Sequence, residues 1–295
     1  MVMLVIGSDG QVGSSLRWRA MARRQSVIGL NRSHLDVTER AAVIDTIQHI
    51  RPEVVVNCAA WTDVDGAEAN EDAALAVNAD GAGYLAEGCA RTGAPLIHLS
   101  TDYVFDGSRM APWREEDAVN PVGAYGRTKE IGERRVRDAW GKHVILRTAW
   151  VFGAIGNNFV KTMLRMAADG RESIRVVGDQ RGGPTPADAI ADACLDIAER
   201  AISADIAPWG TYHYCGAPPV TWHGFASTIL EGRDIRVDAC SSDEFPRPAR
   251  RPANSVLDCS RIRRAFGVEQ PDWRDYLPEL VSAFGETVAD MEKKA

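Results

Sequence analysis

Short apolar runs alternate with longer stretches of helical period over the first half of the chain. Strands that are buried on both faces read as nearly continuous apolar runs, so this alternation indicates βαβ units around a parallel sheet. We therefore expect a Rossmann-type, doubly wound α/β fold in this half. The expected strands are Val2–Ile6, Val27–Leu30, Val54–Val56, Leu96–Ser100 and Val144–Thr148.

Helix signals lie between these runs. The first helix is expected to end near Arg23, and a long third helix covers about Glu71–Ala90. Between them, Asp36 or Thr38 is expected to cap a second helix, with Glu39 closing a capping box.

The pattern becomes irregular beyond Val151, which indicates a second, smaller α/β domain. The predicted division places residues 1–150 in the first domain, with 186–203 packing back on it, and residues 151–185 and 204–295 in the second. The elements expected in this half are strands near Ile174–Val177, Thr211–Cys215 and Ile235–Ala239, and helices at Phe159–Ala168, at Pro186–Ala201, from Thr221 and from about Asp275.

Composition excludes several classes of protein. The 295 residues are 45% hydrophobic and 25% charged, as in ordinary globular domains. The formal charge of −7 provides no general cationic field for nucleic acid or an anionic membrane. Apolar runs fall short of the roughly 18 residues of a membrane span, and the start lacks a signal peptide. We expect no nucleic-acid or membrane partner, a cytoplasmic location, reduced cysteines and no metal site.

Three glycines follow the first strand with the spacing of a phosphate-binding loop. Gly7, Gly10 and Gly13 enclose Gln11 and Val12, and a helix begins within the motif. Glycines permit a tight turn and close approach of the backbone, and the helix N-terminus attracts a pyrophosphate. A bound dinucleotide is the expected consequence; the alternative is a turn that only joins strand to helix.

The end of the second strand bears on which dinucleotide binds. Arg32, next to Asn31, suits the 2′-phosphate of NADPH, although it also fits a solvated loop, and NADH stays open. Asp36 and Val37 could border the adenine. The alternative for Asp36 is that it only caps the second helix. The small residues Ala59 and Ala60 follow the third strand, where a cofactor would lie or where the chain packs tightly.

A phenol and an ammonium group are spaced to share one face of a helix. Tyr125 and Lys129 lie four residues apart, and Thr101 and Asp102 follow the fourth strand, at the edge of the sheet where such folds bind ligands. A nearby cation favours the phenolate of a tyrosine. Tyr125 could then protonate a carbonyl oxygen that Thr101 holds while the carbon accepts hydride.

Ten segments in this order resemble one family, the dTDP-4-dehydrorhamnose reductases among the extended short-chain dehydrogenase/reductases. The resemblance implies Thr101, Tyr125 and Lys129 as catalytic residues, a phosphate-binding turn at Gly10–Val12, and a sugar site with Asp102 and Trp150. It also implies reduction of the C4 keto group of dTDP-4-dehydro-β-L-rhamnose by NADPH, with Tyr125 as proton donor. The segments are GSDGQVG, VVNCAAWTDVD, VNADG, HLSTDYVFDG, YGRTKEIGE, RTAWVFG, GNNF, DQRGGPT, TWHGFA and RPANS.

Two further residues are candidates for contact with the nucleotide diphosphate. The Asn158 amide and the Arg251 guanidinium both suit phosphate oxygens. For Arg251 the alternative is an ion pair that stabilises its loop. Trp222 and His223 are expected to pack against or cap the helix that they open.

Other functions stay open beside the leading one. The chain could reduce or epimerise another 4-keto-6-deoxyhexose nucleotide, or serve as a non-catalytic regulatory subunit with the same fold. A dehydratase is disfavoured because Tyr103 follows Asp102 where those enzymes carry an Asp-Glu pair. The oligomeric state is open too, a homodimer included.

Overall fold

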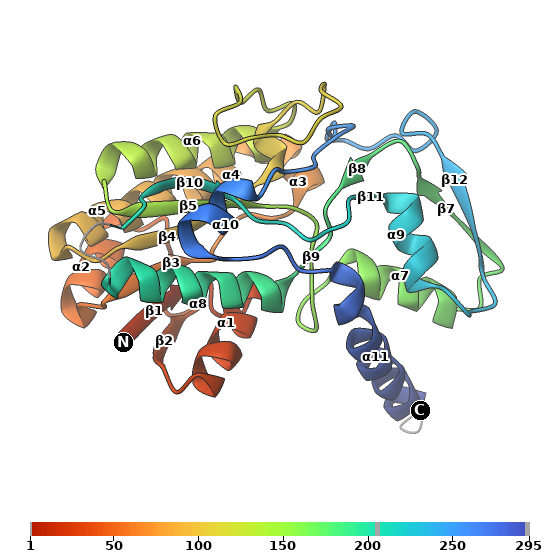
Figure 1. The fold of residues 1–295 in the computed structure, drawn as a ribbon, viewed down its shortest axis with the longest axis horizontal. Coiled ribbons are helices and arrows are strands. Elements are labelled where there is room, and N and C mark those ends of the chain that lie inside the picture. Colours follow the sequence, from red (N-terminus) through yellow and green to blue (C-terminus); the bar gives the residue numbers. More distant parts are fainter. Residues whose placement is uncertain (1, 204–206, 293–295) are drawn as a thin grey trace.

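Six parallel strands form the central sheet (Figure 1). We describe residues 2–203 and 207–292 of a computed structural model, with side chains up to residue 285. The order β10-β5-β4-β3-β1-β2 reverses direction between β1 and β3, as in doubly wound folds. The predicted Rossmann-type fold is thereby confirmed. The strands are β1 (Val2–Ile6), β2 (Ser26–Leu30), β3 (Val54–Asn57), β4 (Leu96–Thr101), β5 (His143–Thr148) and β10 (Gly210–His213).

Helices cover both faces of this sheet, which explains its continuous apolar runs. Along β1, Met3 and Val5 pack on the face that α1 and α8 cover, whereas Leu4 and Ile6 pack on the opposite face. Figure 1 shows α1 and α8 together below the sheet and α6 above it. The helices are α1 (Gln11–Ala22) and α8 (Ala187–Ser203) on one face, and α2 (Arg40–Ile50), α5 (Gly81–Thr92) and α6 (Ala124–Ala139) on the other.

Two predicted helices differ from the structure. Helix α2 begins at Arg40, and Glu39 makes no capping hydrogen bond through its side chain, so the predicted capping box is wrong. The Asp36 carboxylate instead accepts from the Thr38 amide at 3.0 Å and closes a turn before the helix. The long third helix divides into α4 (Glu71–Leu75), the π-helical turn η1 (Ala76–Asp80) and α5.

The second part of the chain packs around its own apolar core. Phe152, Leu164, Phe225 and Trp273 are buried there together. Three two-stranded sheets belong to this part, and no helix within the described ranges is long and apolar enough to cross a bilayer. Its elements are α7 (Phe159–Ala168), α9 (Trp222–Ile229), η3 (Trp273–Tyr276), α11 (Leu277–Glu292) and the strand pairs β6–β9 (Val151–Phe152, Thr185–Pro186), β8–β11 (Arg181–Gly182, Val220–Thr221) and β7–β12 (Ser173–Val177, Arg236–Cys240).

The structure differs from the predicted domain limits at one strand and one helix. Strand β10 pairs in parallel with β5 and extends the large sheet. Tyr212 on β10 and Ile262 on α10 (Ser260–Phe266) are buried in the core of the first domain. The prediction that all residues from 204 onward lie in the second domain therefore does not hold for β10 and α10, because their apolar side chains complete this core.

Candidate active site

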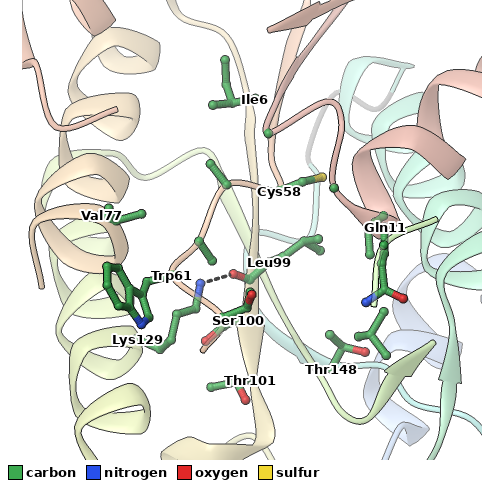
Figure 2. Close-up of a pocket in the computed structure, with 18 of the residues that line it drawn as sticks. Ile6, Gln11, Cys58, Trp61, Val77, Leu99, Ser100, Thr101, Lys129 and Thr148 are labelled. Atoms are coloured by element: carbon green, nitrogen blue, oxygen red, sulfur yellow. Dashed lines mark hydrogen bonds between the residues drawn. The ribbon is translucent and has the colours of Figure 1, made fainter. Parts of the chain in front are cut away.

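A cavity of about 1000 Å³ lies at the carboxyl ends of the central strands (Figure 2). Trp150, shortly after β5, and Trp222 of the second part close its other side. Three predicted site residues, Gly13, Asn158 and Arg251, are not part of its lining. The lining includes all the others: Gly7, Gly10, Gln11, Val12, Asn31, Arg32, Asp36, Val37, Ala59, Ala60, Thr101, Asp102, Tyr125, Lys129 and Trp150.

The glycine loop is shaped for close approach of a phosphate. Gly7 has φ +76°, and a Cβ atom there would lie 2.6 Å from the Ala59 amide nitrogen. A Cβ atom on Gly13 would lie 2.3 Å from the Gly7 carbonyl oxygen, so Gly13 allows the loop to pack on α1. Gly10 is the N-cap of α1. The first-turn amides of α1 are therefore available to an anionic ligand, and the residues present fit a dinucleotide.

Asn31 and Arg32, after β2, line the cavity together with the glycine loop. The Asn31 amide donates to the Asp9 carboxylate at 2.5 Å, while its oxygen accepts from the Ser33 amide at 3.0 Å. Asp9 is a lining residue that the sequence did not single out, although it lies within the glycine motif. The Arg32 side chain is exposed, so it is free to meet a ligand.

Two buried amides hold the loop that carries Ala59 and Ala60. The Asn57 oxygen accepts from the Ala59 amide at 3.0 Å, and the Asn78 oxygen accepts from the Trp61 amide at 2.9 Å. Both asparagine side chains are nearly inaccessible to solvent. Neither was predicted as functional, because a buried asparagine has no recognisable spacing in the sequence.

Thr101, Tyr125 and Lys129 converge at the centre of the cavity. The Tyr125 phenol lies beside the Thr101 hydroxyl, which donates to Asp102 Oδ1 at 3.0 Å. The Thr101 oxygen also accepts from the Tyr103 amide at 3.1 Å, at the start of the turn η2 (Asp102–Val104). The Lys129 ammonium donates to the Leu99 carbonyl oxygen at 2.6 Å, as Figure 2 shows. The spacing predicted from the sequence thus brings a phenol and an ammonium into one site.

Burial sets the acidity of these groups. It lowers the pKa of Lys129 to about 8, an effect that the charge of Glu133 opposes. Burial raises the pKa of Tyr125 to about 12, an effect that the nearby Thr101 hydroxyl opposes. It also raises the pKa of Asp102 to about 7. Asp102 Oδ2 has no hydrogen-bond partner among the residues that the structure describes, so this oxygen is available to a ligand.

Trp150 and Trp222 form an aromatic wall on the side of the second part. Their rings are stacked with centroids 3.5 Å apart and planes 5° apart. Trp150 has φ +47°, and its indole lies directly against Gly182, where a Cβ atom would approach it to 2.4 Å. Trp222 opens α9, as the sequence indicates, but it also lines the cavity, which sequence reasoning missed.

Asn158 and Arg251 contact protein groups in this structure. The Asn158 amide donates to Gln11 Oε1 at 3.1 Å, and its oxygen caps α7. Arg251 makes a two-pronged ion pair with the Asp65 carboxylate, with both N–O distances at 3.0 Å. The ion pair that was the alternative for Arg251 is present, and contact of either residue with a diphosphate stays a prediction.

A dinucleotide loop and a Thr–Tyr–Lys group on a Rossmann-type sheet define an extended short-chain dehydrogenase/reductase. A family model described as the RmlD substrate binding domain matches residues 1–285, and the chain belongs to this family. The resemblance to dTDP-4-dehydrorhamnose reductases is thereby confirmed. Among the described residues, no group of three or more His, Cys, Asp or Glu side chains is placed to hold a metal ion.

Relatives with this activity in their names cover nearly the whole chain. The dTDP-4-dehydrorhamnose reductase of Sinorhizobium fredii is 43% identical and aligns with 96% of this chain and 97% of its own. That of Aggregatibacter actinomycetemcomitans is 40% identical over 94% and 97%. The crystal structure of the Bacillus anthracis reductase in complex with NADP is 33% identical, with a TM-score of 0.89 over 95% of this chain and 98% of the other. A UDP-glucose 4-epimerase from Brucella ovis, 20% identical with a TM-score of 0.81, shares the fold.

Proposed function

We propose that this protein reduces the C4 keto group of dTDP-4-dehydro-β-L-rhamnose to give dTDP-L-rhamnose, with hydride from NADPH. The observation that carries the proposal is the position of Thr101, Tyr125 and Lys129 in the same cavity as the glycine loop. The relatives named above, including one in complex with NADP, support the substrate and the cofactor.

Tyr125 and Thr101 act on the carbonyl oxygen. A ketone that accepts hydride develops negative charge on this oxygen, and a hydroxyl donor at hydrogen-bond distance stabilises it. Tyr125 supplies the proton, while the neighbouring Thr101 hydroxyl holds the carbonyl oxygen. The nicotinamide, when bound, supplies the hydride that ends on C4.

Lys129 makes this proton transfer favourable. Its ammonium group is buried and held by the Leu99 carbonyl oxygen, one turn of α6 from the phenol. A fixed positive charge near Tyr125 stabilises the phenolate that remains after the proton has left. The same ammonium suits hydroxyl groups of a ribose, so Lys129 also orients the cofactor.

The remaining residues divide between the two ligands. The α1 amides and Gln11 suit the pyrophosphate, and Arg32 suits the 2′-phosphate of NADPH. On the other side, the Trp150 indole provides a flat surface for the methyl face of a 6-deoxyhexose, and the unpartnered Asp102 oxygen accepts from a sugar hydroxyl. Asn158 and Arg251 would reach the nucleotide diphosphate only after exchanging their present partners.

The test is an absorbance assay with dTDP-4-dehydro-β-L-rhamnose and NADPH. We expect stoichiometric oxidation of NADPH and formation of dTDP-L-rhamnose. An epimerase restores its cofactor in each cycle, so product without net NADPH oxidation would contradict the proposal. If the protein reduces only a different 4-keto-6-deoxyhexose nucleotide, the proposed reaction class stands and the proposed substrate is wrong. A cytoplasmic location and a homodimer stay predictions, for cell fractionation and analytical ultracentrifugation respectively.

A further inference from the structure

A buried carboxylate lies directly behind the catalytic groups. Tyr125, Lys129 and Glu133 follow one another at spacings of four residues on α6 and therefore share one face of the helix. The Glu133 side chain has no exposed surface. It does not line the cavity, so it contacts neither ligand directly.

Four donors satisfy this carboxylate. Oε1 accepts from the Ser100 hydroxyl at 2.6 Å and from Arg147 Nε at 2.8 Å. Oε2 accepts from Arg147 Nη2 at 2.7 Å and from Arg137 Nη2 at 2.6 Å. Glu133 thus links helix α6 to strands β4 and β5 by charge-assisted hydrogen bonds. The arrangement leaves little freedom for the carboxylate to move.

The bond to Ser100 reaches the catalytic segment of β4. Ser100 lies between Leu99, whose carbonyl oxygen binds the Lys129 ammonium, and Thr101, whose hydroxyl lies beside the Tyr125 phenol. All three consecutive residues of β4 are therefore tied to the same face of α6. A shift of Ser100 would move both catalytic contacts at once.

The charge of Glu133 acts on Lys129 as well. Desolvation disfavours the ammonium form, and the nearby carboxylate opposes this effect. Arg137 and Arg147 both bind the Glu133 carboxylate. Removing the negative charge of Glu133 would therefore leave Lys129 close to two cations with no anion to balance them. The titratable or charged groups that act on Lys129 or on its carboxylate partner lie on or next to five elements. They are Cys58 after β3, His98 on β4, Arg147 on β5, His213 on β10, and Glu133 and Arg137 on α6.

We propose that Glu133 is a positioning residue for the reductase reaction: it holds Ser100, and with it Leu99 and Thr101, against α6 and balances the charge of Lys129. The inference rests on the proposed reductase function for its effect on turnover. The effect on Lys129 itself is independent of any substrate.

The first experiment follows Lys129 directly by NMR of the full chain with ¹³C-labelled lysine. The Cε resonance of Lys129 is assigned by its absence in Lys129→Met. We expect Glu133→Gln to lower the titration midpoint of Lys129 by about one pH unit, the lower end of the usual effect of a neighbouring charge. Few lysines compete in the spectrum, since the chain contains only Lys129, Lys142, Lys161, Lys293 and Lys294.

Glu130→Gln is the matched control, because Glu130 lies on the same helix and pairs with Arg134 at the surface. This variant should leave the midpoint unchanged. In the keto-sugar assay, the alkaline limb of kcat/KM should shift with the Lys129 midpoint in Glu133→Gln and stay in place in Glu130→Gln. An unchanged Lys129 midpoint in folded Glu133→Gln would overturn the proposal.

Ser100→Ala tests the other arm and removes only one hydroxyl, so the fold is retained even if Glu133→Gln fails to fold. We expect kcat to fall roughly tenfold, as for loss of one positioning hydrogen bond, with the Lys129 midpoint unchanged. A wild-type kcat in Ser100→Ala would contradict the positioning role. If wild-type protein fails to turn over the keto sugar, the proposed function fails, while the NMR comparison still decides the link between Glu133 and Lys129.

Discussion

The Trp150 indole stacks face to face on the Trp222 indole, with ring centroids 3.5 Å apart. Trp150 directly follows the end of β5 in the first part, whereas Trp222 opens a helix of the second. The pair therefore joins the two parts of the chain at the wall of the cavity. Each ring depends on the other for its orientation.

Trp222→Ala should impair use of the keto sugar more than binding of NADPH. Without its stacking partner, the Trp150 indole loses its fixed orientation toward the hexose. We expect KM for the sugar nucleotide to rise roughly two- to tenfold, from the 0.5–1.5 kcal/mol of an aromatic pair. Trp150→Ala should have a similar or larger effect. Trp18→Ala, a change of an exposed residue on α1, is the control, and equal losses in NADPH affinity would contradict a role for the pair in sugar binding.

Tyr125→Phe should lower kcat by roughly 10²–10⁴-fold, because it removes the proton donor and keeps the ring. NADPH binding, measured by fluorescence titration, should change little. Tyr84→Phe removes the hydroxyl of a tyrosine on α5 that lies outside the cavity, and it should leave kcat unchanged. A kcat of Tyr125→Phe close to that of the wild type would falsify the assignment of the proton donor.

Reductase activity should fall as the pH rises through about 8, the pKa of buried Lys129. Below this value the ammonium form predominates and favours the phenolate of Tyr125; above it the group is neutral and this support is lost. The measurement is kcat/KM against pH. Lys129→Met should lack this alkaline limb and have low activity throughout, whereas Lys142→Met, at an exposed position, should retain the wild-type profile. A wild-type profile flat from pH 7 to 9 would argue against the role of Lys129.

Arg32→Ala should raise KM for NADPH and leave KM for NADH nearly unchanged, because only NADPH carries the 2′-phosphate. Arg32 is exposed at the end of the cavity, where it makes no contact that holds the fold. Arg200→Ala, an exposed arginine outside the cavity, serves as the control. Equal changes for the two cofactors would show that Arg32 does not read the 2′-phosphate.

The sequence by itself determined those helices, strands and site residues whose geometry depends only on residues close to them along the chain. A parallel strand buried on both faces needs a continuous apolar run, so β1, β3, β4 and β5 are recognisable in the sequence. The glycine spacing reflects one tight turn, and Tyr125 and Lys129 share a helix face because they lie four residues apart. The start of α2 was missed because Asp36 closes a local turn that competes with a helix cap.

Only the tertiary structure decided which distant residues meet. Strand β10 is visible in the sequence, yet its place beside β5 depends on the packing of Tyr212 in the first core. Trp222 reads as an ordinary helix residue until the fold brings it against Trp150. Glu133 lies four residues after Lys129, a spacing that is equally common for carboxylates on the exposed face of a helix. Its burial becomes visible only when Ser100 on β4 and Arg147 on β5 are seen to bind it. Spacing along the chain specifies local geometry, whereas burial and pairing across elements arise only when the layers pack together.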